Sequence, residues 1–170
     1  DGVTMDQAAS TEPLACAAHG VDLAGVRLGD TVLVIGGGPM GNLITQCAAH
    51  AGATTILVSE PIALRRELAL AHGATHVIDP VSQDVEKELK KVRRIGADVV
   101  FEVAGHSGAQ ASCIPLARKG GTIMVLGVFG DEVNHFNAAW VQDREFNILG
   151  SLMYTWRDVT ARIAELEVLR

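Results

Sequence analysis

The sequence predicts an α/β fold, a doubly wound parallel sheet of six strands with helices on both faces. Short apolar runs alternate with helix-length segments along most of the chain, which is the pattern of a parallel sheet covered on both sides. The run at residues 32–35 is apolar throughout, as expected for a strand buried on both faces. The chain has 170 residues, 48% of them hydrophobic, which suits one domain with a full core. Right-handed crossovers then give the doubly wound arrangement.

The predicted elements follow in a regular order. The first strand, 32–35, leads into a helix over 39–51, which has apolar residues at helical spacing and is ended by Gly52. The other strands are predicted at 54–59, 76–79, 98–105, 121–128 and 146–152. The other helices are predicted at 61–74, 82–94, 107–117 and 156–169, and residues 129–145 are predicted to be a long, mostly irregular loop.

Composition and charge argue against several functions. The formal net charge is −6 and the short basic clusters are interleaved with acids, so no basic stripe for nucleic acid is visible. Aromatic residues make up only 4%, too few for a single-strand stacking platform. The three cysteines form no Cys-x-x-Cys pair, so no structural zinc site is predicted. Their odd number and the lack of a signal segment favour the cytoplasm, and no apolar run is long enough to span a membrane.

A glycine-rich turn follows the first strand directly. Gly36, Gly38 and Gly41 fit Gly-x-Gly-x-x-Gly at a strand-to-helix junction. In that motif the first glycine permits the tight turn, the second lets a pyrophosphate approach the backbone, and the third lets the helix pack closely on the strand. Pro39 and Met40 open the helix, where free N–H groups and the helix dipole face an anion. The turn therefore predicts a dinucleotide-binding Rossmann fold.

An acid stands where such folds bind the adenosine ribose. Glu60 ends the second strand, about 20 residues beyond the glycines, and its carboxylate would accept hydrogen bonds from ribose hydroxyls. It would repel a 2′-phosphate, so NAD is favoured over NADP; Arg65 or Arg66 could instead bind such a phosphate or cap the adenine pocket. Glu60 could also be only an exposed acid at a helix start.

Two later glycines stand at the carboxyl ends of strands, where ligands of such sheets bind. Gly105 and Gly127 lie where the chain must turn away from a bound nucleotide, and each is a candidate cofactor contact or simply a turn glycine.

With these residues assembled, the chain resembles the cofactor domain of a zinc-type medium-chain alcohol or polyol dehydrogenase, with the sorbitol and threonine dehydrogenase branch as the nearest likeness. The matching stretches are EPLACAAHGV, GDTVLVIGGGPMG, SEPIALRRELALAHGATHVID, ADVVFEVAGH, GGTIMVLGV and EFNILGSLMYTWRD. They occur in the family's order and cover nearly the whole chain.

The resemblance implies oxidation of a secondary alcohol to a ketone, with hydride transfer to NAD and a catalytic zinc that polarises the alcohol oxygen. In that family a metal-binding half precedes this region, so the chain is expected to be a fragment that binds cofactor but is inactive alone. Residues 1–25 would be a helical hinge from the catalytic half, 26–154 the dinucleotide-binding domain, and 155–170 a helix returning toward the missing half. Glu12 matches a family glutamate at or near the zinc, although an acid before Pro13 also suits a helix start. His19 is expected to be packed rather than a ligand.

Two departures from the family and three rival functions bear on this interpretation. Glu60 stands where many relatives have Asp, and Ala104 replaces a common hydroxyl residue, so one cofactor hydrogen bond would be absent. A short-chain dehydrogenase is excluded because Tyr154 is followed four residues later by Asp158 and not by lysine. A non-enzymatic NAD(H)-binding regulatory module is the main alternative, and a methyltransferase is a weaker one.

The edge strand 146–152 pairs across a two-fold axis in relatives, so a homodimer is expected.

Overall fold

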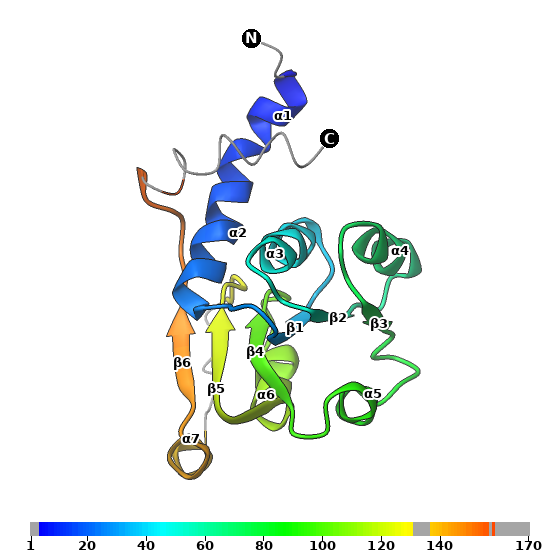
Figure 1. Ribbon diagram of the computed structural model, residues 1–170, viewed down its shortest axis with the longest axis vertical. Coiled ribbons are helices and arrows are strands. Elements are labelled where there is room, and N and C mark those ends of the chain that lie inside the picture. Colours follow the sequence, from blue (N-terminus) through cyan, green and yellow to red (C-terminus); the bar gives the residue numbers. More distant parts are fainter. Residues whose placement is uncertain (1–3, 131–136, 157, 159–170) are drawn as a thin grey trace.

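The computed structural model describes residues 4–130, 137–156 and 158, and in these residues six parallel strands form one sheet (Figure 1). The strand order is β3-β2-β1-β4-β5-β6, so the chain winds outward in both directions from β1 and β4, and the predicted fold class is confirmed. The strands are β1 (Thr31–Ile35), β2 (Thr55–Ser59), β3 (His76–Ile78), β4 (Ala97–Glu102), β5 (Ala117–Val125) and β6 (Asn147–Gly150).

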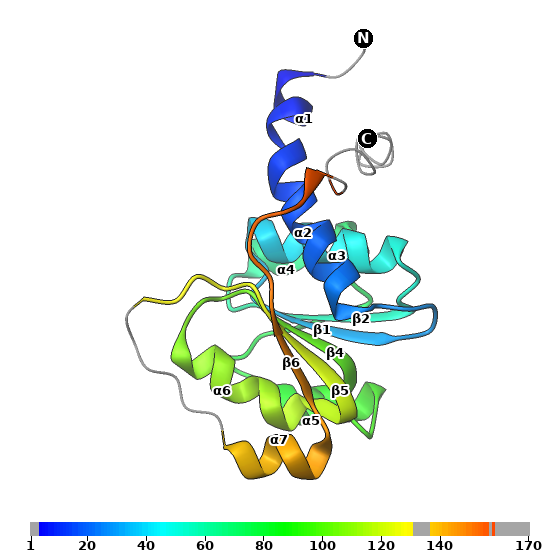
Figure 2. The same cartoon turned by 90° about the vertical axis from the view of Figure 1, so that its left-hand side faces the viewer.

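Helices cover both faces of this sheet, as Figure 2 shows edge-on. One face carries α2 (Thr11–Ala24), α3 (Pro39–His50) and α4 (Ala63–Ala71), and a short helix α1 (Met5–Ala9) precedes α2. The other face carries α5 (Val85–Val92), α6 (Ser107–Leu116) and α7 (Ala138–Arg144). Within the described ranges no helix has both the length and the apolar character needed to cross a bilayer.

The core lies in two layers because side chains alternate between the faces of each strand. Val32 and Val34 belong to the cluster under α2, α3 and α4, whereas Leu33 and Ile35 belong to the cluster under α5, α6 and α7. All four are at most 8% exposed, which explains why β1 is a continuous apolar run rather than an alternating one. Ala17 and Val21 of α2 lie in the first cluster, so α2 packs as part of this core.

Local polar side chains decide where two helices begin. The α5 helix starts at Val85 rather than at residue 82, because the Asp84 carboxylate caps the helix by accepting the N–H of Lys87. In the preceding turn, the Asp79 carboxylate accepts the N–H of Val81. Similarly, Ile62 is extended and donates its N–H to Glu60, so α4 begins at Ala63.

Two predictions after β4 need correction. The β5 strand begins at Ala117, four residues earlier than predicted, because Ala117 pairs with Ala97 across an irregularity in the β4 ladder. The segment 129–145 is not simply irregular, since it contains α7, whose N-terminus is capped by the Asn137 side chain. Residues 131–136 and nearly all of the predicted helix 156–169 lie outside the described residues.

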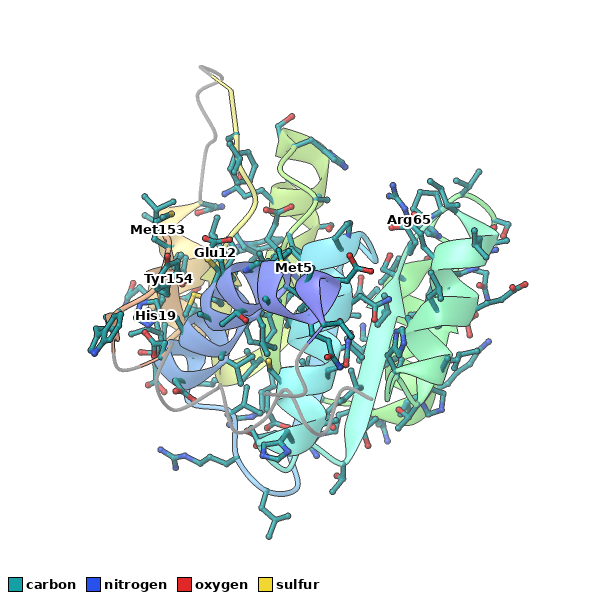
Figure 3. All side chains as sticks on the ribbon, turned by 90° about the horizontal axis from the view of Figure 1, so that it is seen from above. Met5, Glu12, His19, Arg65, Met153 and Tyr154 are labelled. Atoms are coloured by element: carbon teal, nitrogen blue, oxygen red, sulfur yellow. The ribbon has the colours of Figure 1, made fainter. Side chains whose placement is uncertain are left out.

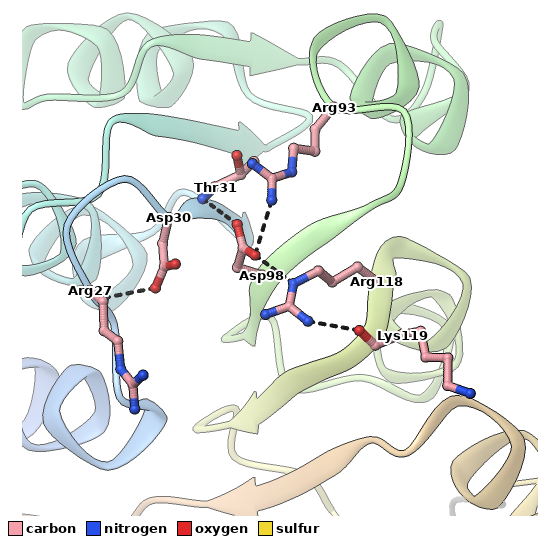
Figure 4. A network of polar contacts seen from close by, with 7 residues as sticks. All are labelled: Arg27, Asp30, Thr31, Arg93, Asp98, Arg118 and Lys119. Carbon is pink, nitrogen blue, oxygen red and sulfur yellow. Dashed lines mark hydrogen bonds and ion pairs between the residues drawn. The ribbon is translucent and has the colours of Figure 1, made fainter.

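A buried carboxylate ties together the starts of three strands (Figure 4). Asp98 of β4 accepts the N–H of Thr31 at 2.8 Å, the Nε–H of Arg118 at 2.5 Å and an Nη2–H of Arg93 at 3.2 Å. Burial raises the pKa of Asp98, but the Thr31 N–H and the two arginines outweigh burial, and its pKa is lowered. Asp98 is therefore a carboxylate that fastens β1, β4 and β5 at the edge opposite the glycine-rich turn.

Candidate dinucleotide-binding site

The glycine-rich turn leaves β1 at the carboxyl edge of the sheet. Gly36 has φ +107°, a conformation that favours glycine, and its N–H donates to the Ser59 carbonyl, which extends the β1–β2 ladder by one bond. Gly38 is the N-cap of α3 and Pro39 its first residue. The turn thus has the strand–turn–helix geometry that the motif requires.

The spacing of the glycines has two different steric reasons. A Cβ at Gly41 would lie 1.9 Å from the Gly36 carbonyl oxygen, so glycine is needed there for α3 to pack against the turn. A Cβ at Gly38 would meet only Nη1 of Arg65, at 3.9 Å. The protein itself therefore does not require glycine at 38, and the free space lies where a ligand phosphate would approach the backbone.

The first turn of α3 presents unpaired backbone donors. The N–H groups of Gly38, Met40 and Gly41 have no acceptor within the described residues, whereas the N–H of Asn42 already bonds to the Gly38 carbonyl. No acidic side chain occupies this first turn. Together with the helix dipole, these donors favour an anion at the end of α3.

The Glu60 carboxylate is buried beneath the same turn. Its Oε2 accepts the N–H of Gly37 at 2.7 Å, its Oε1 accepts the N–H of Ile62 at 2.9 Å, and the residue is only 2% exposed. The alternative of an exposed acid at a helix start is therefore wrong for Glu60. Because each carboxylate oxygen has two lone pairs, both oxygens can still accept a hydrogen bond from a ligand hydroxyl.

The two arginines that follow Glu60 differ in their surroundings. Arg66 is anchored, since its Nη1 donates to the carbonyls of Glu60 and Pro61, and its Nη2 lies 3.7 Å from Asp79. Arg65 has an exposed side chain whose Nη1 lies 3.8 Å from Oε2 of Glu60. Arg65 is therefore the arginine that is available to a ligand, while Arg66 fastens the start of α4.

A cavity of about 560 Å³ lies at the carboxyl edge of the sheet, lined by Glu60, Arg65 and, from the turn, Gly36. Apolar side chains that follow β3 and β4 complete its walls. Members of the lining are Gly36, Ser59, Glu60, Ile62, Arg65, Val81, Val103 and His106. A cavity of this volume, mostly apolar with a few convergent polar groups, suits a nucleotide-sized ligand.

The loops after β4 and β5 pack on each other through the other two predicted glycines. Gly105 has φ +71°, and a Cβ on it would lie 2.6 Å from the Val128 carbonyl oxygen. A Cβ on Gly127 would lie 2.2 Å from Oε2 of Glu102 and 2.5 Å from the Gly105 nitrogen. Both glycines are therefore required by the protein, whether or not they also touch a ligand.

A fully buried acid lies beneath these loops. Oε1 of Glu102 accepts the N–H groups of Ala104 and Gly105, and Oε2 has no partner within the described residues. Burial raises the pKa of Glu102, an effect that the two backbone donors oppose. Glu102 holds the chain where β4 ends, and its position inside the apolar run VVFEV was the only sequence signal for it.

The remaining candidates lie on α2, away from Arg65, as Figure 3 shows from above. Glu12 is exposed and accepts a hydrogen bond from the Cys16 thiol at 3.3 Å, and the described residues contain no group of three side chains that could hold a metal. Burial raises the pKa of Cys16 to about 11, and Glu12 adds to this. His19 is packed, as predicted, with its Nδ1 3.2 Å from Asp158.

The structure brings together Gly36, Gly38, Pro39, Met40, Gly41, Glu60 and Arg65 around one edge of the sheet, with Gly105 and Gly127 in the neighbouring loops. Sequence reasoning missed Gly37, whose N–H binds Glu60 and whose Cβ, if present, would lie 2.9 Å from the Glu60 Cβ. The available signal was the run of three consecutive glycines at 36–38, in which Gly37 is the middle residue.

Comparisons with known proteins agree with this geometry. A family model described as zinc-binding dehydrogenase matches residues 39–167. The chain is 32% identical to sorbitol dehydrogenase of Bacillus subtilis (91% of this chain, 44% of that protein) and 36% identical to D-guloside 3-dehydrogenase of Escherichia coli (81% and 42%). The chain thus spans less than half the length of these curated relatives.

Solved structures share the fold. One from Sinorhizobium meliloti, described as a zinc-binding dehydrogenase bound to NADP, superposes with a TM-score of 0.87 at 36% identity, covering 94% of this chain and 49% of that one. L-idonate 5-dehydrogenase of Escherichia coli superposes with a TM-score of 0.86 at 28% identity, covering 98% and 47%.

Proposed function

This chain belongs to the zinc-binding dehydrogenase family, and from that premise we propose that it is the cofactor-binding part of an enzyme that oxidises a secondary alcohol or polyol to a ketone, with hydride transfer to NAD. One observation carries the proposal: at the start of α3, N–H groups without an acceptor among the described residues lie beside Gly38, where a Cβ would meet no close protein atom but would occupy the space of a ligand. Relatives named as dehydrogenases favour an enzyme over a non-enzymatic regulatory module.

The chain's own residues bind and orient the dinucleotide. The N–H groups of Met40 and Gly41 would hold the diphosphate, and Glu60 would accept hydrogen bonds from the adenosine ribose. The loops at Gly105 and Gly127 would shape the far end of the site and aim the nicotinamide. When bound, NAD⁺ supplies the hydride acceptor: the alcohol carbon loses a hydride to it and the hydroxyl loses a proton.

We propose NAD rather than NADP because the Glu60 carboxylate lines the cavity beside the glycine-rich turn, and at the expected ribose position it would repel a 2′-phosphate. The exposed Arg65 beside it is the feature that favours NADP, and the Sinorhizobium meliloti structure was determined with NADP. We therefore expect the strength of the preference for NAD over NADP to depend on Arg65.

We keep Glu12 as a candidate zinc contact, but the described residues do not form a zinc site by themselves. The Cys16 thiol donates a hydrogen bond to Glu12, and its raised pKa disfavours the thiolate that zinc binds. Zinc ligands would have to come from outside the described residues, so no step of the reaction is assigned to a metal here.

We also propose a domain arrangement and an assembly. Residues 1–25 would be the helical hinge to a catalytic half, 26–154 the cofactor domain, and 155–170 a segment returning to that half. The edge strand β6 would pair with a second copy through residues 146–152, where Leu149 and Leu152 are 39% and 82% exposed. Leu152→Glu should convert a dimer to a monomer in sedimentation experiments, and a monomeric unsubstituted chain would contradict the proposal.

No disulfide joins Cys16, Cys47 or Cys113, which is consistent with the reducing cytoplasm that we propose as the location. The net charge of −6 leads us to expect no nucleic-acid partner. The named relatives lead us to propose a small alcohol as the partner molecule, and we expect no membrane association because no apolar run is long enough to span a bilayer.

The decisive experiment is a fluorescence titration of the chain with NADH, comparing Gly38→Ala with Gly130→Ala. The Cβ of the first variant meets no close protein atom, so its free energy of unfolding should fall by no more than about 1 kcal/mol, the cost of an N-cap substitution. Its NADH affinity should fall by ~10-fold or more, about 1.4 kcal/mol. Gly130 lies in open space, so its variant is a matched control that should bind as before. Equal affinities for both variants, or no binding by the unsubstituted chain, would overturn the proposal.

A further inference from the structure

A second hollow lies at the amino edge of the sheet, opposite the cofactor site. It has a volume of about 730 Å³ and is lined by Arg93, Ile95, Asp98, Arg118, Lys119 and Arg144, which we call the basic pocket. These residues come from the starts of β4 and β5, the turn after α5 and the end of α7, which Figures 1 and 2 both place at the same end of the molecule. A smaller hollow of about 210 Å³ adjoins it and shares Ile95 and Arg144.

Positive charge is concentrated around these two hollows. Among the described residues that line them are six of the chain's fourteen lysines and arginines but only two of its twenty carboxylates. The whole chain carries a net charge of −6, so this excess is confined to one place. Like charges gathered in a concave site repel one another, and a bound anion relieves that repulsion.

The acids in the lining do not saturate these cations. Asp98 serves both Arg93 and Arg118, as Figure 4 shows, and the other lining acid, Glu86, is paired with Lys90. Within the described residues the ion pair of Lys119 is a long contact of 3.8 Å to Glu145, in which both side chains are exposed. Such an exposed pair contributes little energy and can yield to a ligand.

Three arginines have N–H donors that no carboxylate among the described residues accepts. Within the described part of the chain, Arg94 and Arg144 form no ion pair, and both are exposed. Arg93 gives Asp98 one N–H, and its buried Nε–H has no acceptor among the described residues. A planar guanidinium binds phosphate and carboxylate groups in a bidentate manner, so these side chains suit an oxyanion.

We propose that the basic pocket binds a small anion that carries several phosphate or carboxylate groups. The hollow is the size of a small molecule, and the surrounding net negative charge of the chain disfavours a long polyanion such as nucleic acid. Because the basic pocket and the glycine-rich turn lie at opposite edges of the sheet, both sites can be filled at once. This inference does not depend on the proposed function.

The test is a calorimetric titration of the chain with tripolyphosphate in saturating NADH, which keeps the glycine-rich turn occupied. The double variant Lys119→Ala/Arg144→Ala removes two cations of the basic pocket that do not contact Asp98, so the fold is preserved while affinity falls by ~10-fold or more. The matched control is Lys87→Ala/Lys91→Ala, which removes the same charge from α5 outside the lining and should change affinity by less than about twofold.

A titration with Gly38→Ala, without NADH, separates this site from the cofactor site and should give unchanged tripolyphosphate binding. The proposal is overturned if tripolyphosphate does not bind, if NADH competes with it, or if the two double variants lose affinity equally. The last result would mean that only overall charge matters.

Discussion

The N–H of Gly37 donates a 2.7 Å hydrogen bond to Oε2 of Glu60, so the glycine-rich turn and the acid after β2 form one unit. The contact is close, since a Cβ on Gly37 would lie 2.9 Å from the Glu60 Cβ. The acid that we propose for the ribose and the turn that we propose for the diphosphate are thereby held at a constant separation. Such preorganisation reduces the entropy that binding must cost.

Arg65→Ala should sharpen the preference for NADH over NADPH. The Arg65 guanidinium is exposed and reaches both Gly38 and Glu60, where it could pair with a 2′-phosphate. Loss of one charge-assisted contact, worth about 1.5–3 kcal/mol, should weaken NADPH binding by ~10-fold or more and NADH binding by much less. Fluorescence titrations with both cofactors check this, and equal losses for the two would contradict it.

Gly41→Ala should destabilise the fold. Its Cβ would lie 1.9 Å from the Gly36 carbonyl oxygen, which cannot move without breaking the turn, so we expect a loss of ~3 kcal/mol in the free energy of unfolding. Urea denaturation measures this, with Gly38→Ala as the control, which should lose no more than about 1 kcal/mol as an N-cap substitution. A stable Gly41→Ala variant would show that α3 can shift away from β1.

Asp98→Asn should lower stability by about 1–3 kcal/mol at neutral pH, because two arginines lose their buried carboxylate. The folded-state pKa of Asp98 is lowered, so its stabilising contribution is complete above the unfolded-state pKa of about 3.9 and is lost as the pH falls through the folded-state value. The difference in the free energy of unfolding between the unsubstituted chain and Asp98→Asn should therefore become smaller at acidic pH. Urea unfolding at pH 7 and pH 3.5 tests this, and a gap that does not change with pH would refute it.

Glu102→Gln should have the opposite dependence on pH. The pKa of Glu102 is raised in the folded state, so the native protein binds this proton more tightly and gains stability as the pH falls toward the unfolded-state pKa of about 4.3. Glutamine has no proton to gain, and its side-chain oxygen can still accept the Ala104 and Gly105 N–H groups. Relative to the unsubstituted chain, the variant should have its most favourable free energy of unfolding at pH 8 and its least favourable at pH 5. Urea unfolding at both pH values measures this, and the reverse order would show that Glu102 is stabilising as a carboxylate.

Local patterns in the sequence predicted the order of elements and the glycine-rich turn correctly, but not all boundaries. Hydrophobic periodicity and glycine spacing act over a few residues, so β1, α3 and their junction could be read directly. The start of α5 could not be predicted, because the helix-like segment 82–94 begins two residues before Asp84, the side chain that caps the helix. The α7 helix was missed because it is short and lacks buried residues.

The sequence by itself determined the fold class, the family and the position of a glycine-rich strand-to-helix turn, because each depends on residues that are neighbours along the chain. Only the tertiary structure decided that Glu60 is held by Gly37, that Gly127 must make room for Glu102, and that Asp98 gathers Arg93 and Arg118 at the opposite edge. These contacts join residues far apart in sequence, and parallel strand pairing alone sets their distance and burial.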